Sequence, residues 1–252
     1  MSNAKSRQVY GNLLLAGSLS LCGCSMKLLA LRQTAALMED GVGGFGAYAF
    51  LFLEGSQDDR ARELYRRGRD YGFKLLEAKA PFKGITTMDL PTIEAALRAA
   101  SKKDVPALFW TAYDWAGWVN LSRDSMEAVA DLPKAVAIMQ KVRDLDPSYQ
   151  FGGPDLFLGA YYASRPKMLG GDPEKAKTHF SRAKELTQGK YLLAFWLEAR
   201  YYAVAVQDPE LFRRLLDQVK TGPAGALPWA RLADEVAKRK AEALLERKDE
   251  LF

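Results

Sequence analysis

The chain has 252 residues, 48% of them hydrophobic, which is enough to bury one large core or to build a repeat array. Lysine and arginine number 36 against 31 aspartate and glutamate, and the formal net charge of +5 is spread along mixed-sign segments. This mild, dispersed charge argues against nucleic acid as a partner. One histidine and two cysteines without metal-ligand spacing lead us to expect no metal site and no cofactor.

Residues 1–23 predict a bacterial lipoprotein signal peptide. Lys5 and Arg7 precede an apolar run over 13–21, which is too short to span a bilayer as a mature helix. The run ends in a segment that resembles the lipobox, Leu21-Cys22-Gly23-Cys24. We therefore expect cleavage before Cys24, acylation of its sulfur, and an exported protein held to a membrane by lipid. An ordinary signal peptide with an incidental cysteine is the alternative.

Residues 24–44 are expected to form a tether and a short N-terminal helix. The glycines of Gly41-Val42-Gly43-Gly44-Phe45-Gly46 satisfy G-x-G-x-x-G literally. A dinucleotide site needs a strand before these glycines, whereas residues 27–39 have a helical pattern. The glycines therefore predict a flexible turn that leads into a single domain over 45–252.

From residue 59 onward, apolar residues recur with the helical period, and strand and hairpin signals are nearly absent. Helices are predicted over 59–80, 92–102, 105–121, 133–145, 155–164, 173–187, 190–206, 208–220 and 229–249. Asp172 and Asp208 each precede a proline and are typical helix N-caps. The fold class is all-α, with residues 229–252 as a solvated C-terminal capping helix.

Three of these helices have the small–large–small spacing of the second helix of a tetratricopeptide repeat, and a fourth, with the last set named below, fits it loosely. The matching residues are Ala61, Tyr65 and Gly68; Ala135, Met139 and Val142; Ala176, Phe180 and Ala183; and Phe212, Leu216 and Val219. Small residues let two helices cross closely while the larger one fills the groove between them. We predict stacked antiparallel helix hairpins, a degenerate tetratricopeptide-like α-solenoid, with longer connections at 124–132 and 164–172.

Aromatic residues cover most of the circumference of the predicted helix at 109–118, so this helix is buried on most sides or lines a cavity. A second aromatic group follows near residue 160. A large aromatic core and an apolar ligand pocket both explain the pattern. The candidates for a ligand cleft or pore are Phe109, Trp110, Tyr113, Asp114, Trp118, Phe157, Tyr161 and Tyr162. Asp114, if buried, needs a hydrogen-bond or ion-pair partner such as Arg123.

No catalytic set is expected. His179, the single histidine, has no nucleophile or metal-ligand partner at a characteristic spacing, which favours a structural or surface role. An exported hydrolase is a further hypothesis, and a polar cleft with His179 hydrogen-bonded to a carboxylate would favour it.

Five stretches, spread in order over nearly all of the chain from residue 60, carry a more specific pattern. They are 64–72 (LYRRGRDYG), 104–112 (DVPALFWTA), 145–149 (LDPSY), 170–180 (GGDPEKAKTHF) and 239–252 (RKAEALLERKDELF). With the lipobox and the cryptic repeats, they resemble the TatT family, the T-component lipoproteins of tetratricopeptide-associated TRAP transporters. Family members often have a longer acidic helical region before the first repeat than this chain has.

The resemblance implies a non-enzymatic accessory of a TRAP-type transport system, anchored by lipid to the periplasmic face of the outer membrane or of the inner membrane. It implies a homotrimer that docks the solute-binding P component. It also implies a cleft and pore for an apolar ligand in each subunit, and makes His179 part of a helix signature. The alternative is a generic tetratricopeptide lipoprotein that scaffolds an envelope assembly complex.

Overall fold

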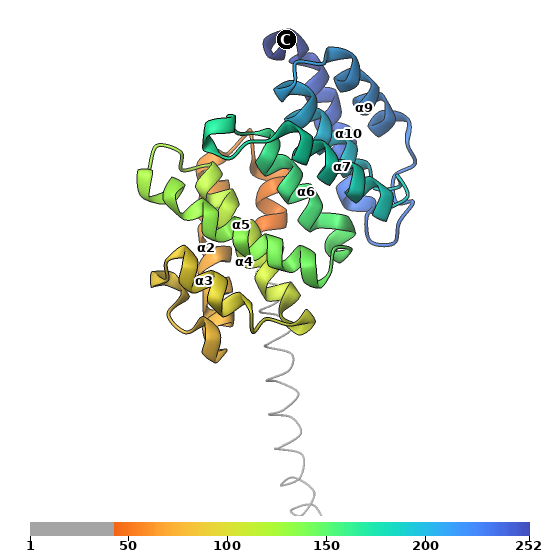
Figure 1. Ribbon diagram of the computed structural model, residues 1–252. Helices are drawn as coiled ribbons and strands as arrows, with labels where there is room; N and C mark the ends of the chain where they lie inside the picture. The colour runs from red at the N-terminus through yellow and green to blue at the C-terminus, as the bar shows by residue number, and fades with distance from the viewer. Residues whose placement is uncertain (1–42) are drawn as a thin grey trace, which may run out of the picture. The chain divides into compact units, whose positions relative to one another are not determined.

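Helices alone build the part of the chain that the computed structural model describes, residues 43–252 (Figure 1). Residues 42–252 belong to one compact unit. The predicted signal peptide, Cys24 and the tether up to residue 42 lie outside the described residues. None of the helices within 43–252 is long and apolar enough to cross a membrane. The prediction of an all-α fold is confirmed.

The described part begins with a helix at residues 43–48 that continues as the π-helix η1 (Ala49–Leu53). The longer helices are α2 (Asp58–Glu77), α3 (Leu90–Leu97), α4 (Val105–Asn120), α5 (Met126–Leu145), α6 (Tyr149–Ala163), α7 (Pro173–Leu186), α8 (Leu192–Leu197), α9 (Pro209–Thr221) and α10 (Arg231–Glu246). Shorter elements are η2 (Ala80–Phe82), η3 (Ile85–Thr87), η4 (Lys102–Asp104), η5 (Lys167–Leu169), the π-helix η6 (Glu198–Ala203) and α11 (Lys248–Leu251).

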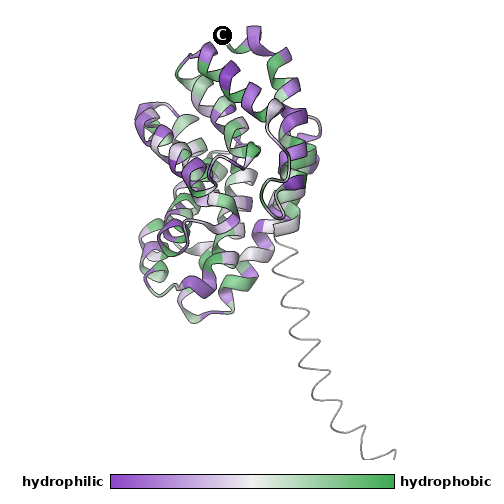
Figure 2. Ribbon diagram, turned by 90° about the vertical axis from the view of Figure 1, so that its right-hand side faces the viewer, coloured by the Kyte–Doolittle hydropathy of each residue, from purple (hydrophilic) through white to green (hydrophobic). Residues whose placement is uncertain are grey.

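Two large hydrophobic clusters divide most of the helices into two halves, and a third, smaller cluster joins the helix at 43–53 to α2. The first cluster is built mainly by α2, α3, α4 and α5, and the second by α6, α7, α8, η6, α9 and α10. In Figure 1, the helices of the first half run in colour from orange to light green and those of the second half from green to blue. In the turned view, hydrophobic and hydrophilic stretches alternate along many of the helices, as expected for amphipathic helices packed on a core (Figure 2).

The repeat spacing identified core residues. All twelve residues of the four small–large–small sets are buried, and most have no exposed surface. Neighbouring helices pack as α4 with α5, α6 with α7, and α8 and η6 with α9. Close crossing of these pairs explains the small residues. The tetratricopeptide-like stacking of the pairs stays a prediction.

Helix α5 begins seven residues before the predicted start at residue 133. Ser125 caps it by accepting a hydrogen bond from the Ala128 amide at 3.2 Å, and Pro133 lies inside the helix. The prediction of a long connection over 124–132 was wrong because proline was taken as a helix boundary. The buried residues Ala128 and Leu132 show that tertiary packing outweighs the lost backbone hydrogen bond.

The turn predicted for the glycine motif is a helix over its described part, residues 43–46. Gly43 and Gly46 face α4 at close range: a Cβ at Gly43 would lie 2.7 Å from Trp110 Cε2, and one at Gly46 would overlap Asp114. The glycines therefore serve close helix packing rather than chain flexibility.

The predicted C-terminal cap differs in detail from the observed one. Helix α10 begins at Arg231, because Trp229 has a left-handed backbone with φ of 66°, and the helix ends at Glu246 before the short α11. Helix α10 packs against α8 and α9, so it covers the end of the second half.

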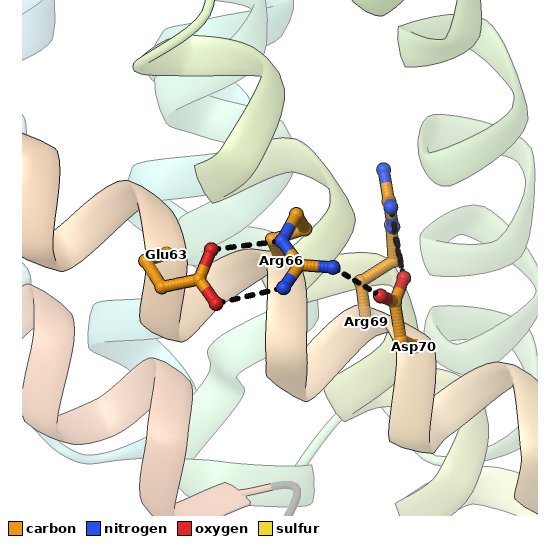
Figure 3. Close-up of polar contacts among 4 residues, drawn as sticks. All are labelled: Glu63, Arg66, Arg69 and Asp70. Atoms are coloured by element: carbon orange, nitrogen blue, oxygen red, sulfur yellow. Dashed lines mark hydrogen bonds and ion pairs between the residues drawn. The ribbon is translucent and has the colours of Figure 1, made fainter.

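An ion-pair network follows the exposed face of α2 (Figure 3). Arg66 contacts both carboxylate oxygens of Glu63, at 2.8 and 2.7 Å, and Asp70 at 2.9 Å. Arg69 donates to Asp70 at 3.0 and 2.8 Å, and its guanidinium lies 4.2 Å from the ring centroid of Trp118. Pairs of this kind contribute about 0.2–0.5 kcal/mol each on a helix surface. The network thus ties α2 to α4 at Trp118.

Candidate functional site

An apolar cavity of about 610 Å³ lies between the two halves of the helical unit. Its wall is drawn from the helix at 43–53, α4, α5, α6, α8, η6 and the segment 229–233. This volume is within the range of about 300–1,000 Å³ that is common for small-molecule sites. Five of the eight predicted cleft residues lie on this wall: Phe109, Trp110, Tyr113, Phe157 and Tyr161.

Helix α4 positions the aromatic wall by dividing its rings between two sides. The rings of Phe109 and Tyr113 stack with centroids 6.0 Å apart, and Trp110 meets Tyr113 edge-on at 5.5 Å. On another side, Trp115 is buried against Phe73 with centroids 4.8 Å apart. Core and cavity, the two alternatives for the aromatic helix, are therefore both present on α4.

The other three predicted residues lie away from the cavity wall. The Trp118 ring lies under the guanidinium of Arg69, a residue of α2. Tyr162 borders a second, polar cleft that is lined by residues of α5, α6 and α7. Asp114 is fully buried between α4, the helix at 43–48 and α2, where Gly46 and Gly68 make room for its carboxyl group.

The prediction that buried Asp114 has a charged or hydrogen-bonding partner was wrong. Neither carboxyl oxygen has a hydrogen-bond partner among the residues that the structure describes. Arg123, the suggested partner, donates to the Asn120 carbonyl instead, at 3.0 Å. Burial raises the pKa of Asp114 well above its ordinary value, since an isolated carboxylate is costly in an apolar setting.

Glu54 and Tyr65 form a polar contact on the cavity wall. The Tyr65 hydroxyl donates to Glu54 Oε1 at 2.5 Å. Burial raises the pKa of Glu54, opposed by this hydrogen bond and by the positive charges of Lys240 and Arg200. The Lys240 ammonium lies 5.5 Å from the ring centroids of Phe50 and Trp196. The cations of the surrounding helices therefore offset part, but not all, of the effect of burial on this acidic group.

Unusual backbone concentrates at the cavity. Among the described residues, five non-glycine residues have left-handed φ values, and Gln150, Phe151 and Trp229 of these five lie on the wall. The π-helices η1 and η6 also contribute wall residues, such as Phe50 and Tyr201. Strained backbone and π-helical turns are typical of functional sites.

Exposed apolar side chains extend the wall to the surface. Trp229 is 95% exposed, and Leu169 and Leu232 are about 60% exposed, although all three also line the cavity. The buried Asp234 holds this region by accepting hydrogen bonds from the amides of Leu192 and Gly225, both at 2.9 Å. We call Leu169, Trp229 and Leu232 the apolar rim.

The polar cleft has a volume of about 580 Å³ and is lined by residues of α5, α6 and α7. Two of its lining residues contact Asp155: His179 Nδ1 lies 2.7 Å from Asp155 Oδ1, and Arg143 Nε donates to the same oxygen at 2.8 Å. Asp155 is fully buried. The His179 ring stacks on Tyr162 with centroids 5.5 Å apart and planes inclined by 8°.

A polar cleft with His179 hydrogen-bonded to a carboxylate is the arrangement that would favour a hydrolase. The other groups in the cleft decide between a catalytic role and a structural role. The cleft wall has no serine or cysteine, and the hydroxyl of its threonine, Thr178, donates to the Glu174 carbonyl at 2.9 Å. Asp155 is already paired with Arg143. Because the three charged or polar groups come from three helices, the contacts hold α5, α6 and α7 together. No group of three metal-ligating side chains occurs within residues 43–252.

Several wall residues were missed from the sequence. Glu54 and Arg165 lie in or beside connections, and Trp229 was assigned to a helix that begins after it. Tyr65 was recognised as a repeat residue but not as a wall residue. The crowding of aromatic residues at 109–118 is visible in the sequence. No pattern in the sequence indicates that separate connections meet at one wall of a cavity.

The comparison with known families now decides the assignment. A model of the family described as TRAP transporter T-component matches residues 28–252, nearly the whole chain. The chain belongs to the TRAP transporter T-component family. The predicted resemblance is confirmed. This is a family of transporter accessory components and not of enzymes, and it indicates a location in the cell envelope.

A relative gives a narrower match. An uncharacterized protein of Treponema pallidum (strain Nichols) is 31% identical over 123 residues, which is 48% of this chain. The match spans 38% of that relative's length.

Proposed function

We propose that the chain is a lipid-anchored periplasmic T component that binds or passes an apolar ligand in its cavity and docks the solute-binding P component of a TRAP system. The observation that carries the proposal is the 610 Å³ apolar cavity with its exposed rim in a member of this family. Acylation of Cys24, attachment to the periplasmic face of the outer membrane and assembly as a homotrimer are parts of the same proposal.

The ligand function is tested with a neutral apolar dye, N-phenyl-1-naphthylamine, whose fluorescence rises on entering an apolar site. We expect saturable binding to the wild-type protein and loss of binding in Ala160→Phe, which places a ring inside the cavity. Ala95→Phe, on the exposed face of α3, is the matched control and should bind as wild type. Equal binding by both variants would place the dye elsewhere.

The docking function is tested by crosslinking and co-purification with the TRAP solute-binding protein of the same organism. Large exposed apolar residues at a partner surface are typical binding anchors. We expect Trp229→Ser together with Leu232→Ser to weaken capture. Met126→Ser is the control, since Met126 is 87% exposed but not part of the cavity wall. A clean monomer that captures no solute-binding protein would contradict docking and trimer formation together.

The anchor is tested by mass spectrometry of the protein purified from membranes. We expect an acylated chain that begins at Cys24, and a Cys24→Ala variant that leaves the membrane fraction. A full-length chain without acyl groups would overturn the lipid anchor. Capture of envelope assembly proteins in place of a transporter component would favour the generic scaffold.

A further inference from the structure

We propose that the ligand of the apolar cavity is an amphiphile with an anionic head group, held by Arg123 and Arg165 while its apolar part lies among the aromatic rings. This inference rests on the proposed function, because it takes the cavity to be the ligand site. It adds the chemical class of the ligand and the residues that select it.

The charges on the cavity wall are unevenly matched. The ionisable acids and bases on the wall are Glu54, Arg123 and Arg165, besides tyrosines. Glu54 accepts a hydrogen bond from the Tyr65 hydroxyl and is close to the cations Lys240 and Arg200. Neither Arg123 nor Arg165 forms an ion pair with a described residue; the ion pairs within residues 43–252 all use other cations. The unmatched charge of the wall is therefore positive.

The two arginines come from separate connections but meet at one place. Arg123 follows α4, and its guanidinium donates to the carbonyl and side-chain oxygens of Asn120, which also lines the cavity. Arg165 follows α6 and lies over the Tyr161 ring at 5.1 Å. Burial lowers the pKa of Arg165, and the neighbouring charge of Arg123 lowers it further. Arg123 is exposed and Arg165 is half-buried, and two neighbouring guanidinium groups without an acid between them repel each other. An anion placed there would remove the repulsion.

The surroundings of this pair fit an amphiphile better than a small free anion. Arg165 neighbours Tyr161, and the wall continues from there to Phe157, Leu132 and Phe109. A carboxylate or phosphate can accept two parallel hydrogen bonds from one guanidinium, and each buried methylene of an attached chain adds about 0.8 kcal/mol. A head group at the arginines and a chain among the rings would satisfy both parts of the wall.

The test uses displacement of the same neutral dye from the mature protein by ligands that share one alkyl chain. The probes are laurate, dodecyl phosphate and the neutral dodecanol. We expect both anions to displace the dye at concentrations about 10- to 100-fold below dodecanol, as charged hydrogen bonds predict. Higher salt should reduce this advantage. A preference for dodecyl phosphate alone would identify a phosphate head group, and a preference for laurate alone a carboxylate; either supports the proposal.

The double variant Arg123→Gln, Arg165→Gln should lose the preference for anions and keep the affinity for dodecanol. The matched control, Lys83→Gln with Lys167→Gln, removes two exposed charges that are not on the wall and should behave as wild type. Equal displacement by laurate, dodecyl phosphate and dodecanol in the wild-type protein would overturn the head-group assignment without any variant, and leave the cavity as an apolar site. Failure of the dye itself to bind would remove the proposed ligand function as well.

Discussion

The apolar cavity and the polar cleft have nearly the same volume, about 610 and 580 Å³, but the half-buried Glu54 of the cavity and the fully buried Asp155 beside the cleft are paired in different ways. In the cleft, Asp155 contacts Arg143 and His179 directly, at 2.8 and 2.7 Å. In the cavity, Glu54 has one phenol donor, and Arg123 and Arg165 have no acid. The Asp155 carboxylate contacts groups of two neighbouring helices and so joins them, whereas charges left unpaired at an apolar wall are available to a ligand. This difference supports a structural role for the cleft and the proposed binding role for the cavity.

The largest effect is expected for Asp155→Ala in the polar cleft. Removing this fully buried carboxylate leaves the Arg143 charge and His179 without their partner, and breaking such a pair costs about 3–5 kcal/mol. Urea unfolding measures the loss. Asp144→Ala removes an exposed acid from the same cleft and should change stability by less than about 0.5 kcal/mol. An Asp155 variant that stays stable but loses a hydrolytic activity would break the comparison and make the cleft a site.

The next largest effect on stability is expected for one of two tryptophans of α4, Trp115, when it is compared with Trp110. Trp115, 2% exposed, lies in the core, and Trp115→Ala should cost about 3–5 kcal/mol by leaving an internal void. Trp110→Ala should cost about 1–2 kcal/mol, because the space it opens joins a cavity that already exists. Parallel urea titrations measure the difference. Equal losses would show that Trp110 belongs to the core and that the cavity is filled in solution.

Much of the fold could be predicted from the sequence because helix packing leaves a local signal. The spacing of Ala176, Phe180 and Ala183 identified buried positions, since every third or fourth residue of a helix faces the same neighbour. The signal failed at Pro133, where a buried stripe continued through a residue that usually ends a helix. It also failed at Gly43, which lies in a helix and not in a turn. A glycine is needed there because Trp110 leaves no room for a side chain.

Less of the site could be predicted, because it depends on groups that meet only in the folded chain. The rings of Phe109 and Tyr113 were found through their crowding on one helix. Arg123 and Arg165 lie in different connections, and no local pattern indicates that they share a wall. The usual rule for buried charges predicted a partner for Asp114. The structure shows none among the described residues, and burial raises the pKa of Asp114 instead, which favours its neutral form.

A smaller effect is expected at Gly68, which separates Asp114 from α2. A Cβ at Gly68 would overlap the Asp114 carboxyl group, so Gly68→Ala should destabilise by about 1–3 kcal/mol despite the better helix propensity of alanine. Combining it with Asp114→Ala should recover most of the loss, as a double-mutant cycle would measure. Gly44→Ala, where no atom lies within 4 Å, should be neutral or stabilising. Additive losses in the cycle would show that Asp114 does not occupy that space.

The smallest effect is expected for two glutamates, Glu54 of the cavity wall and the exposed Glu63, whose contributions to stability should depend on pH with opposite signs. Burial raises the folded-state pKa of Glu54 above 4.5, so the stability it contributes is present below that pH and is lost as the pH rises through the folded pKa. Glu54→Gln should therefore gain stability relative to wild type as the pH rises above about 4.5.

Glu63, exposed and paired with Arg66 on α2 (Figure 3), has a lowered pKa, and its contribution is present above pH 4.5 and lost as the pH falls. Glu63→Gln should therefore lose stability relative to wild type at neutral pH and converge with it in acid. Urea midpoints of the three proteins, measured from about pH 2.5 to pH 8 so that the range extends below the ordinary glutamate pKa, test both signs. Parallel curves for the two variants would mean that Glu54 is as well solvated as Glu63, and the cavity wall would then be open to water at its one acidic group.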